Sequence, residues 1–401
     1  MLLTATQACG SDKASGGGDG EWATGPVYVG TTRIFGQDSS TGYMYRLHSL
    51  DGADVVDLKQ AVELSEDAWV FGNADPYFYT AAVFSPRIAQ WSLDARGDFV
   101  KGQLVDFSNQ GVKGTFSAAF APMYSSEKSY FVDGDSGRLI VWNPKAMEFI
   151  RAVDLDLSLP AGHTGASDLT PSAEFTTTKD AVLVTVTWSS QASGWTQTAS
   201  FSRLIVIDPK TDTVVSTVDR DGCESLSPAG TASDGTTYFA AWDYKAAVRG
   251  VFGTGFGASS CGLRVLPQAN GFDAGFVVDL STLAGGKPAG SAFLEDDQHL
   301  LIHVWDNSLV GATAQNWIDN KRWEAGYLWY RWTIGDAQAV PVAGQTPSGE
   351  GGSWQKLDGR RLTYSPNAEF SETTFMWLGG DGSLSSGLRV PGYTVATIRA
   401  R

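Results

Sequence analysis

The segment Ile207-Asp208-Pro209-Lys210-Thr211-Asp212-Thr213-Val214-Val215-Ser216-Thr217-Val218 decides the fold class. An apolar strand ends at Ile207, a turn containing Asp, Pro and Lys follows, and a second strand begins at Thr213. Asp, Asn, Pro and Gly supply the fixed or positive φ angles that a tight turn between antiparallel strands needs. This segment therefore predicts a β-hairpin.

The same strand–turn–strand unit recurs along the chain. Its first strand ends at seven places, 43 to 68 residues apart: Leu50, Leu93, Trp142, Ile207, Leu266, Ile334 and Leu378. The strands after the turns are expected at 54–58, 99–107, 148–155, 213–218, 274–280, 337–342 and 386–390. A supersecondary unit repeated at such intervals is typical of a β-propeller.

Two further strands precede most copies of the hairpin. The first is rich in small residues and suits the crowded centre of a propeller: 68–71, 115–120, 173–178, 230–233, 291–294 and 353–357. The second is more apolar: 77–82, 130–132, 181–188, 238–242, 300–305 and 361–364. Very little of the chain is expected to be helical.

The first blade has no inner strand of its own, and the chain ends with a spare strand at 393–399. We expect this C-terminal strand to close the ring in the first blade, which removes exposed sheet edges. The sequence thus predicts an all-β protein, a seven-bladed β-propeller of four-stranded antiparallel blades, as one domain over 25–401. Six or eight blades are the alternatives.

Composition limits the partners. The 401 residues carry a net charge of −15 and the pI is near 4.6. Nucleic acid is excluded as a partner because phosphate binding needs a surplus of Lys and Arg. No run approaches the ~18 apolar residues of a membrane helix.

The start of the chain carries a second informative pattern. Ala8 and Cys9 are followed by a polar tether rich in Gly and Ser. A small residue before a cysteine, followed by such a tether, resembles the cleavage site and linker of bacterial lipoproteins. We expect residues 1–24 to form an anchor and tether, with lipid on Cys9 holding an exported chain at the outer membrane or cell surface. The alternative is a disordered terminus without an anchor.

Connection length predicts which face of the propeller is functional. Because antiparallel strands reverse direction, connections from strand two to three and from strand four to the next blade share one face. The long connections fall in these classes: 189–202, 243–262, 306–325, the shorter 365–373, and the interblade 156–171, 219–228 and 343–352. Cys223 and Cys261 lie on this face, which favours a disulfide over two unrelated thiols.

These connections combine aromatic and basic residues although the protein is acidic. Aromatic rings supply flat apolar area and cation–π surfaces, and basic groups neutralise an anionic ligand. The predicted ligand-binding residues are Trp195, Tyr244, Lys245, Arg249, Trp317, Lys321, Arg322 and Trp323. The alternative is that these rings cap the core or pack the connections together.

No catalytic residue is predicted. The chain has neither a Gly-x-Ser-x-Gly nucleophile motif nor a Gly-x-x-x-x-Gly-Lys phosphate loop. His299 and His303 are four residues apart, which spans roughly 13 Å in a strand and is not the helical pair of a zinc site. His163, in a connection of the ligand face, is the histidine to test. The sequence predicts no metal site and no cofactor.

The lipoprotein-like start, the seven-bladed pattern and the aromatic and basic connections together resemble bacterial surface propeller lipoproteins associated with iron–siderophore capture. The resemblance implies a protein that binds an anionic aromatic iron chelate and works beside an outer-membrane receptor. It transfers no binding residue. Two alternatives stay open: a propeller hydrolase or lyase acting on an extracellular substrate, and a protein-interaction scaffold at the membrane.

Overall fold

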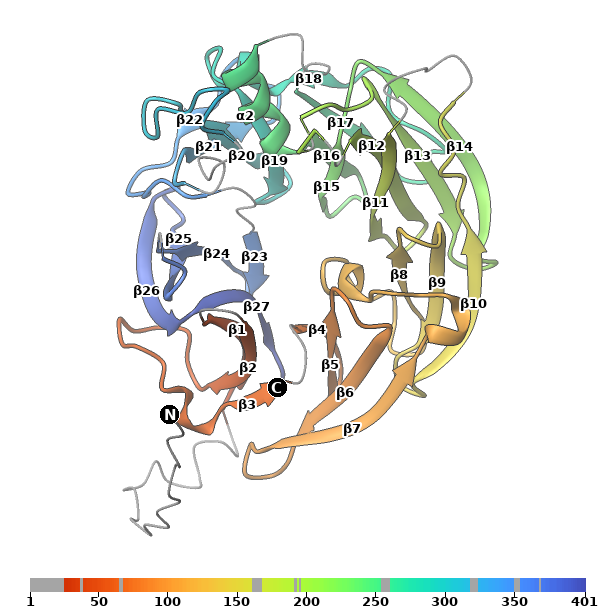
Figure 1. Cartoon of the computed structure of the whole chain (residues 1–401), viewed down its shortest axis with the longest axis vertical. Helices are drawn as coiled ribbons and strands as arrows, with labels where there is room; N and C mark the ends of the chain where they lie inside the picture. Colours follow the sequence, from red (N-terminus) through yellow and green to blue (C-terminus); the bar gives the residue numbers. More distant parts are fainter. Residues whose placement is uncertain are drawn as a thin grey trace, which may run out of the picture.

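Seven antiparallel sheets stand side by side in a ring (Figure 1). This computed structural model describes residues 25–401 except 37–38, 65–67, 161–167, 191–192, 195, 254–259, 318–323, 350–353 and 368. The predicted anchor, residues 1–24 with Cys9, lies outside the described residues. The predicted seven-bladed β-propeller is confirmed.

The blades are numbered along the chain, with strands given from the centre outward. Blade 1 contains β27 (Tyr393–Arg399), β1 (Tyr28–Phe35), β2 (Ser40–Leu47) and β3 (Val62–Leu64). Blade 2 contains β4 (Ala68–Ala74), β5 (Tyr77–Ala82), β6 (Arg87–Leu93) and β7 (Phe99–Asp106). Blade 3 contains β8 (Ser129–Asp133), β9 (Arg138–Asn143) and β10 (Glu148–Asp154).

Blades 4 to 7 repeat the four-stranded pattern. Blade 4 contains β11 (Leu169–Thr177), β12 (Val182–Ser190), β13 (Phe201–Asp208) and β14 (Thr213–Asp221). Blade 5 contains β15 (Leu226–Thr231), β16 (Thr237–Ala241), β17 (Cys261–Val265) and β18 (Val277–Asp279). Blade 6 contains β19 (Ala289–Leu294), β20 (His299–Trp305), β21 (Tyr327–Thr333) and β22 (Val340–Pro341). Blade 7 contains β23 (Trp354–Leu357), β24 (Arg360–Pro366), β25 (Glu372–Leu378) and β26 (Leu384–Pro391).

The C-terminal strand closes the ring as predicted. β27 pairs antiparallel with β1, from Tyr28 opposite Arg399 to Arg33 opposite Tyr393. Blade 1 is therefore built from both ends of the described chain, and β1 is paired on both sides, with β27 and with β2.

The predicted inner strand at 115–120 is wrong. Residues Phe116–Ala119 form the short 3₁₀ helix η3 instead. The Ser117 hydroxyl accepts from the Val132 N–H at 2.9 Å and donates to the Val132 carbonyl at 2.6 Å. One side chain therefore takes the place of a neighbouring strand for the backbone of Val132, on the edge of β8. A Cβ on Gly114 would lie 2.1 Å from the Val83 carbonyl oxygen. Any other residue would clash here, so the backbone can approach Val83 this closely only with glycine at this position.

The connection at 243–262, expected to lack regular structure, begins with helix α2 (Asp243–Phe252). An acidic residue opens the helix, and Gly253 ends it at a φ of 93°. A second short helix, α3 (Leu280–Leu283), follows β18. None of the helices in the described part of the chain has the length and apolar content to cross a membrane.

The outer strand of blade 1 also differs from the prediction. It was expected at 54–58, but β3 begins at Val62, after the 3₁₀ helix η1 (Leu58–Gln60). Val55 instead forms an isolated parallel bridge with Arg389 of blade 7. The earlier segment therefore links two blades rather than extending one.

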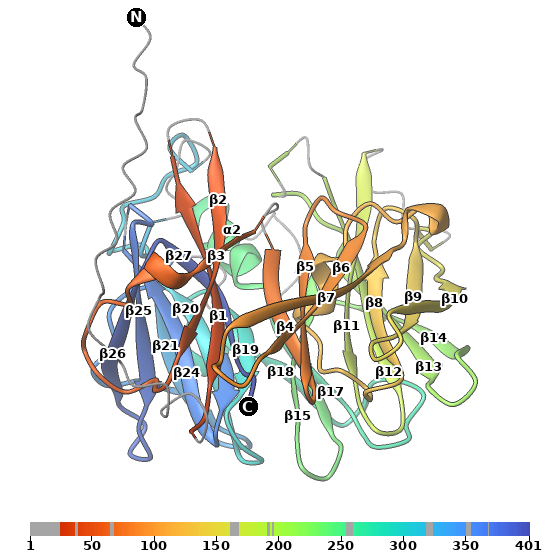
Figure 2. The same cartoon turned by 90° about the horizontal axis from the view of Figure 1, so that it is seen from below.

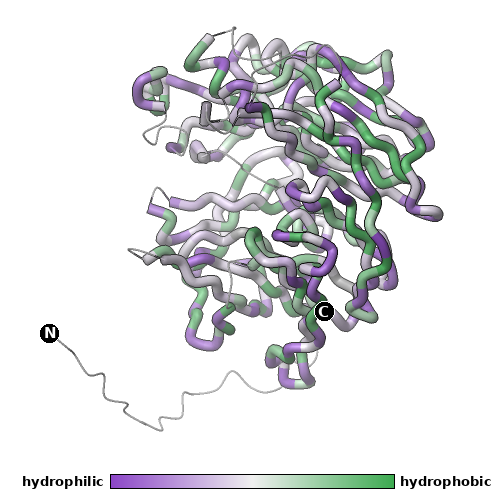
Figure 3. The backbone as a smooth tube through the Cα atoms, turned by 45° about the vertical axis from the view of Figure 1, so that its right-hand side comes forward, coloured by the Kyte–Doolittle hydropathy of each residue, from purple (hydrophilic) through white to green (hydrophobic). Residues whose placement is uncertain are grey.

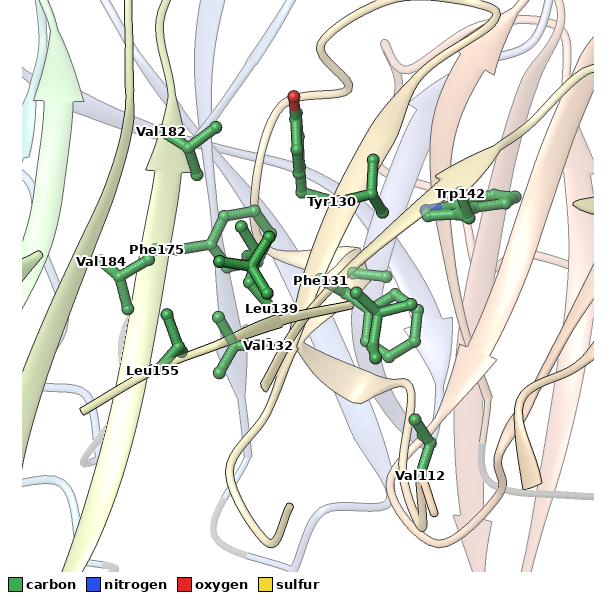
Figure 4. Packing of buried hydrophobic residues seen from close by; sticks show 14 of the residues in the cluster. Val112, Tyr130, Phe131, Val132, Leu139, Trp142, Leu155, Phe175, Val182 and Val184 are labelled. Carbon is green, nitrogen blue, oxygen red and sulfur yellow. The ribbon is translucent and has the colours of Figure 1, made fainter. Parts of the chain in front are cut away.

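The core lies between neighbouring blades. Apolar residues follow the strands, and many turns are hydrophilic (Figure 3). The ring of Trp142 is fully buried and packs edge-on against Tyr79 of blade 2, with centroids 5.5 Å apart. Tyr130, Val132 and Leu139 of blade 3 lie opposite Val182 and Val184 of blade 4 (Figure 4). Each sheet thus buries both faces against its neighbours, which supplies most of the apolar burial.

The antiparallel topology places the long connections at one side, which we call the long-loop face. It comprises the β12–β13, β16–β17, β20–β21 and β24–β25 connections and the interblade connections β10–β11, β14–β15 and β22–β23. In the side view, α2 lies towards the same side as the tip of the β1–β2 hairpin (Figure 2). The two belong to the same class of connection, between second and third strands.

A disulfide joins two connections of the long-loop face. Cys223 follows β14 and Cys261 begins β17, with Cα atoms 5.7 Å apart. Both residues are 2% exposed. The predicted pairing is confirmed.

Replacing both residues, Cys223→Ala with Cys261→Ala, is expected to lower the free energy of unfolding by about 2–4 kcal/mol. The bond spans a sequence separation of 38 residues and restricts the unfolded chain. Urea unfolding followed by tryptophan fluorescence measures the change, with wild type unfolded in dithiothreitol as the matched control. Equal midpoints for the oxidised wild type and the double variant would contradict this role.

Candidate functional site

Half of the predicted ligand-binding residues lie in the described part of the chain. Tyr244, Lys245 and Arg249 are on α2, and Trp317 lies in the β20–β21 connection. The remaining predicted residues and the histidine singled out for testing lie outside the described residues: Trp195, Lys321, Arg322, Trp323 and His163.

Tyr244 joins three long connections. Its hydroxyl donates to the Gly194 carbonyl of the β12–β13 connection at 2.5 Å and accepts from the Trp317 indole N–H at 3.3 Å. Tyr244 and Trp317 are each 1% exposed. The three connections therefore converge, and these two rings pack them together, as in the alternative reading of the sequence.

The basic residues of α2 also belong to this packed layer. Lys245 is 3% exposed, and its Nζ lies 5.5 Å from the ring centroid of Tyr244 and 5.8 Å from that of Trp242. Such cation–π contacts stabilise a partly desolvated ammonium. Arg249, in the last turn of α2, is half-buried.

Three polar side chains from separate parts of the chain meet at the start of α2. His303 Nδ1 lies 2.5 Å from Asp243 Oδ2, and His303 Nε2 lies 2.8 Å from Ser348 Oγ. Asp243 and His303 have no exposed surface, whereas Ser348 is half-buried. Of these three residues, which we call the relay, only Ser348 has appreciable exposed surface.

Asp243 is oriented by its own helix. It follows the end of β16 and is the first residue of α2, where helix N–H groups favour a negative charge. Its Oδ1 accepts the Tyr244 backbone N–H at 2.9 Å. The other carboxylate oxygen is thereby directed at His303.

The imidazole plane of His303 is set by stacking. Its ring centroid lies 4.5 Å from that of Tyr327 and 4.2 Å from that of Trp329, with interplanar angles of 19° and 20°. Both aromatic residues come from β21, which pairs with β20. Rotation of the imidazole out of this plane would lose both stacking contacts, so the two nitrogens stay aligned with their partners.

Ser348 belongs to the β22–β23 connection and is held against the same strand, β21. Its backbone exchanges hydrogen bonds of 2.9 and 3.0 Å with Tyr327. Three residues earlier, the Gln345 amide accepts from the Trp329 N–H at 2.5 Å and donates to the Trp329 carbonyl at 2.9 Å. The β22–β23 connection is therefore bound along β21 beside the histidine ring.

The contacts run in the order carboxylate, imidazole, hydroxyl. When Nδ1–H donates to the carboxylate, the Nε2 lone pair faces the serine hydroxyl and can accept its proton. This is the geometry that activates a serine as a nucleophile. Within the described ranges, no three His, Cys, Asp or Glu side chains are placed to hold a metal ion.

None of the relay residues was predicted from the sequence as a site residue, although two lie in connections expected on the functional face. Asp243 and Ser348 belong to 243–262 and 343–352, and His303 sits near the end of a strand entering that face. His303 was considered only with His299, which contacts Asp296 at 2.8 Å instead. A polar residue close to the end of a strand that enters the long-loop face is a signal for Asp243 and His303, whereas Ser348 lies in the middle of its connection and gives no such signal.

Tyr244→Phe is expected to lower the free energy of unfolding by about 1–3 kcal/mol, because it removes the bond to Gly194 and leaves the buried Trp317 N–H unpaired. Urea unfolding measures the loss, and the half-buried Tyr77→Phe serves as control. Equal stabilities of both variants would argue against the packing role of Tyr244.

No protein-family model matches the chain, and no curated protein sequence matches it. The chain is similar to the structure of the periplasmic gluconolactonase PpgL of Pseudomonas aeruginosa, with a TM-score of 0.57, 10% identity, and coverage of 93% of this chain and 98% of that one. A protein from Lactobacillus plantarum gives a TM-score of 0.51, 12% identity, and coverage of 92% and 99%. Apo AztD from Citrobacter koseri gives a TM-score of 0.44, 9% identity, and coverage of 93% of this chain and 98% of that one. At these identities the two similarities with TM-scores above 0.5 show the fold alone, a β-propeller.

Proposed function

We propose that this chain is an exported propeller hydrolase that cleaves a carboxylic ester or lactone at its long-loop face. The proposal is carried by the unbroken contact from Asp243 through His303 to the half-buried Ser348. The reaction class follows from the side chains, because a serine beside a histidine base attacks acyl carbons.

In the proposed reaction, Ser348 Oγ attacks the acyl carbon while His303 Nε2 takes the hydroxyl proton. The tetrahedral intermediate collapses, and the alkoxide receives that proton and becomes an alcohol, which leaves when the substrate is an open-chain ester and stays attached to the acyl group when it is a lactone. Water then attacks the acyl–serine ester and gives a proton to Nε2, which returns it to Ser348 as the carboxylic acid leaves. Asp243 holds the Nδ1–H throughout and keeps Nε2 in the accepting form.

The choice of ester and lactone substrates has a second support. PpgL is named a gluconolactonase, and a lactone is an internal ester that the same attack opens. The shared fold, at 10% identity, guides which substrates to test first and transfers no residue.

Export is part of the proposal. The Cys223–Cys261 disulfide supports it, because such bonds persist in oxidising compartments. Lipid attachment at Cys9 and a location at the outer membrane or cell surface are proposed on the lipoprotein-like start of the sequence.

Ser348→Ala is expected to abolish covalent labelling by a fluorophosphonate and to lower kcat/KM for p-nitrophenyl acetate or gluconolactone by about 10³-fold or more. Peptide mapping of the labelled wild type locates the modified serine, and assays of the purified protein give the rates. Ser308→Ala, an exposed serine of the β20–β21 connection, is the matched control. Wild type that takes no label at Ser348 would refute the hydrolase.

The second candidate function is capture of an anionic aromatic iron chelate, with an outer-membrane receptor as partner. It is favoured by a cluster of aromatic rings towards the long-loop face. The ring centroids of Trp69, Phe116 and Phe120 lie 4.5 to 4.8 Å from one another, in edge-to-face geometry. Phe120 is 54% exposed, and Phe84 of the β5–β6 connection is 94% exposed. Exposed rings of this kind can stack on an aromatic ligand.

A capture protein would show tryptophan quenching on titration with a ferric catecholate, without any covalent labelling. The quenching is expected to weaken in Phe120→Ala, and in Arg249→Ala with Arg322→Ala if the basic residues contribute as first predicted. Identical curves for wild type and all variants would remove both sets of named residues.

A further inference from the structure

The inner strand of blade 6 is interrupted directly beside the relay. Along the β19–β20 ladder, Gly290 pairs with His303 and Ala292 pairs with Ile302, so Ser291 is an extra residue without a partner in β20. Such a β-bulge bends a strand locally and redirects its side chains. The bulge begins at the residue that faces His303.

Ser291 occupies a conformation that glycine adopts more easily. Its φ is 35°, in the region that side chains rarely enter. The inner strand β4 is irregular as well, and its unpaired residue Gly72 takes the positive φ value of 69°. In β19 the unpaired residue with a positive φ is a serine, which places a hydroxyl at this point.

That hydroxyl contacts the relay. Ser291 Oγ accepts the backbone N–H of Asp243 at 3.0 Å, in a buried environment. The Asp243 carboxylate is oriented separately, through the Tyr244 N–H. The backbone of Asp243 is therefore held by blade 6, although the residue itself follows a strand of blade 5.

Gly290 sets the distance between the two blades at this point. A Cβ there would lie 2.8 Å from Asp243 Cα and 2.9 Å from both Asp243 N and the Ala241 carbonyl oxygen. These are backbone atoms, which cannot rotate away. Gly290 thus packs against the backbone of Asp243 and also pairs with His303.

We infer that the β19 bulge, Gly290–Ser291, is a positioning element of the relay, and that Ser291 is a positioning residue acting through Asp243. The inference rests on the proposed hydrolase function. It assigns to blade 6 both the base, His303, and the support that places the carboxylate against it.

Ser291→Gly tests this role, because it removes the hydroxyl and keeps a residue that accepts positive φ. We expect fluorophosphonate labelling of Ser348 to slow by about 10- to 100-fold, and kcat for p-nitrophenyl acetate to fall equally at unchanged KM. The downfield proton resonance of the His303 Nδ1–H, assigned by its loss in His303→Gln, should shift or disappear. Ser291→Asn, which tolerates positive φ and offers a carbonyl acceptor, should recover part of the rate.

Ser172→Gly, the same change at an exposed position of inner strand β11, is the matched control and should label at the wild-type rate. Circular dichroism and thermal melting verify folding, and Ser291→Ala replaces Ser291→Gly if the latter does not fold. A labelled wild type, with equal labelling and an unchanged resonance in Ser291→Gly, would overturn the positioning role alone. A wild type without label at Ser348 would instead overturn the hydrolase.

Discussion

An even number of chain crossings per blade is the constraint on which the rest of the structure depends. Antiparallel strands reverse direction, so four crossings return the chain to the face where the blade began. Blade 3 keeps this parity although it has three strands, because the segment with η3 crosses in place of an inner strand. Connections of one class therefore share a face all round the ring, and residues distant in sequence meet there.

The fold was largely predictable because its signals are local. Turn residues such as Asp208-Pro209-Lys210 and the short apolar runs beside them report the hairpins directly. The errors occur where a local signal competes with a tertiary contact. Small residues at 115–120 suit a crowded inner strand, but the Ser117 hydroxyl satisfies the edge of β8 from a helical turn. In α2, Asp243 is a residue type that favours a helix start, but the aromatic residues beside it and the glycines from Gly250 onward are typical of an irregular connection.

The candidate site was predictable only to the level of the face. Their residue type and their place in long connections predicted that Tyr244 and Trp317 would contact a ligand, yet the convergence of the connections buries both rings against each other. The same convergence brings Asp243, His303 and Ser348 together. No spacing in the sequence encodes that meeting, because it depends on how two neighbouring blades and an interblade connection dock.

The β1–β27 pairing has a consequence for the order of folding. Almost the whole described chain separates the two strands, so their contact closes a very long loop and is among the slowest kinds to form. Until β27 emerges from synthesis, the inner edge of β1 presents unpaired N–H and C=O groups. A nascent chain of this protein therefore passes through a stage in which one open edge can template pairing with another molecule, and completion of the last strand ends that exposure.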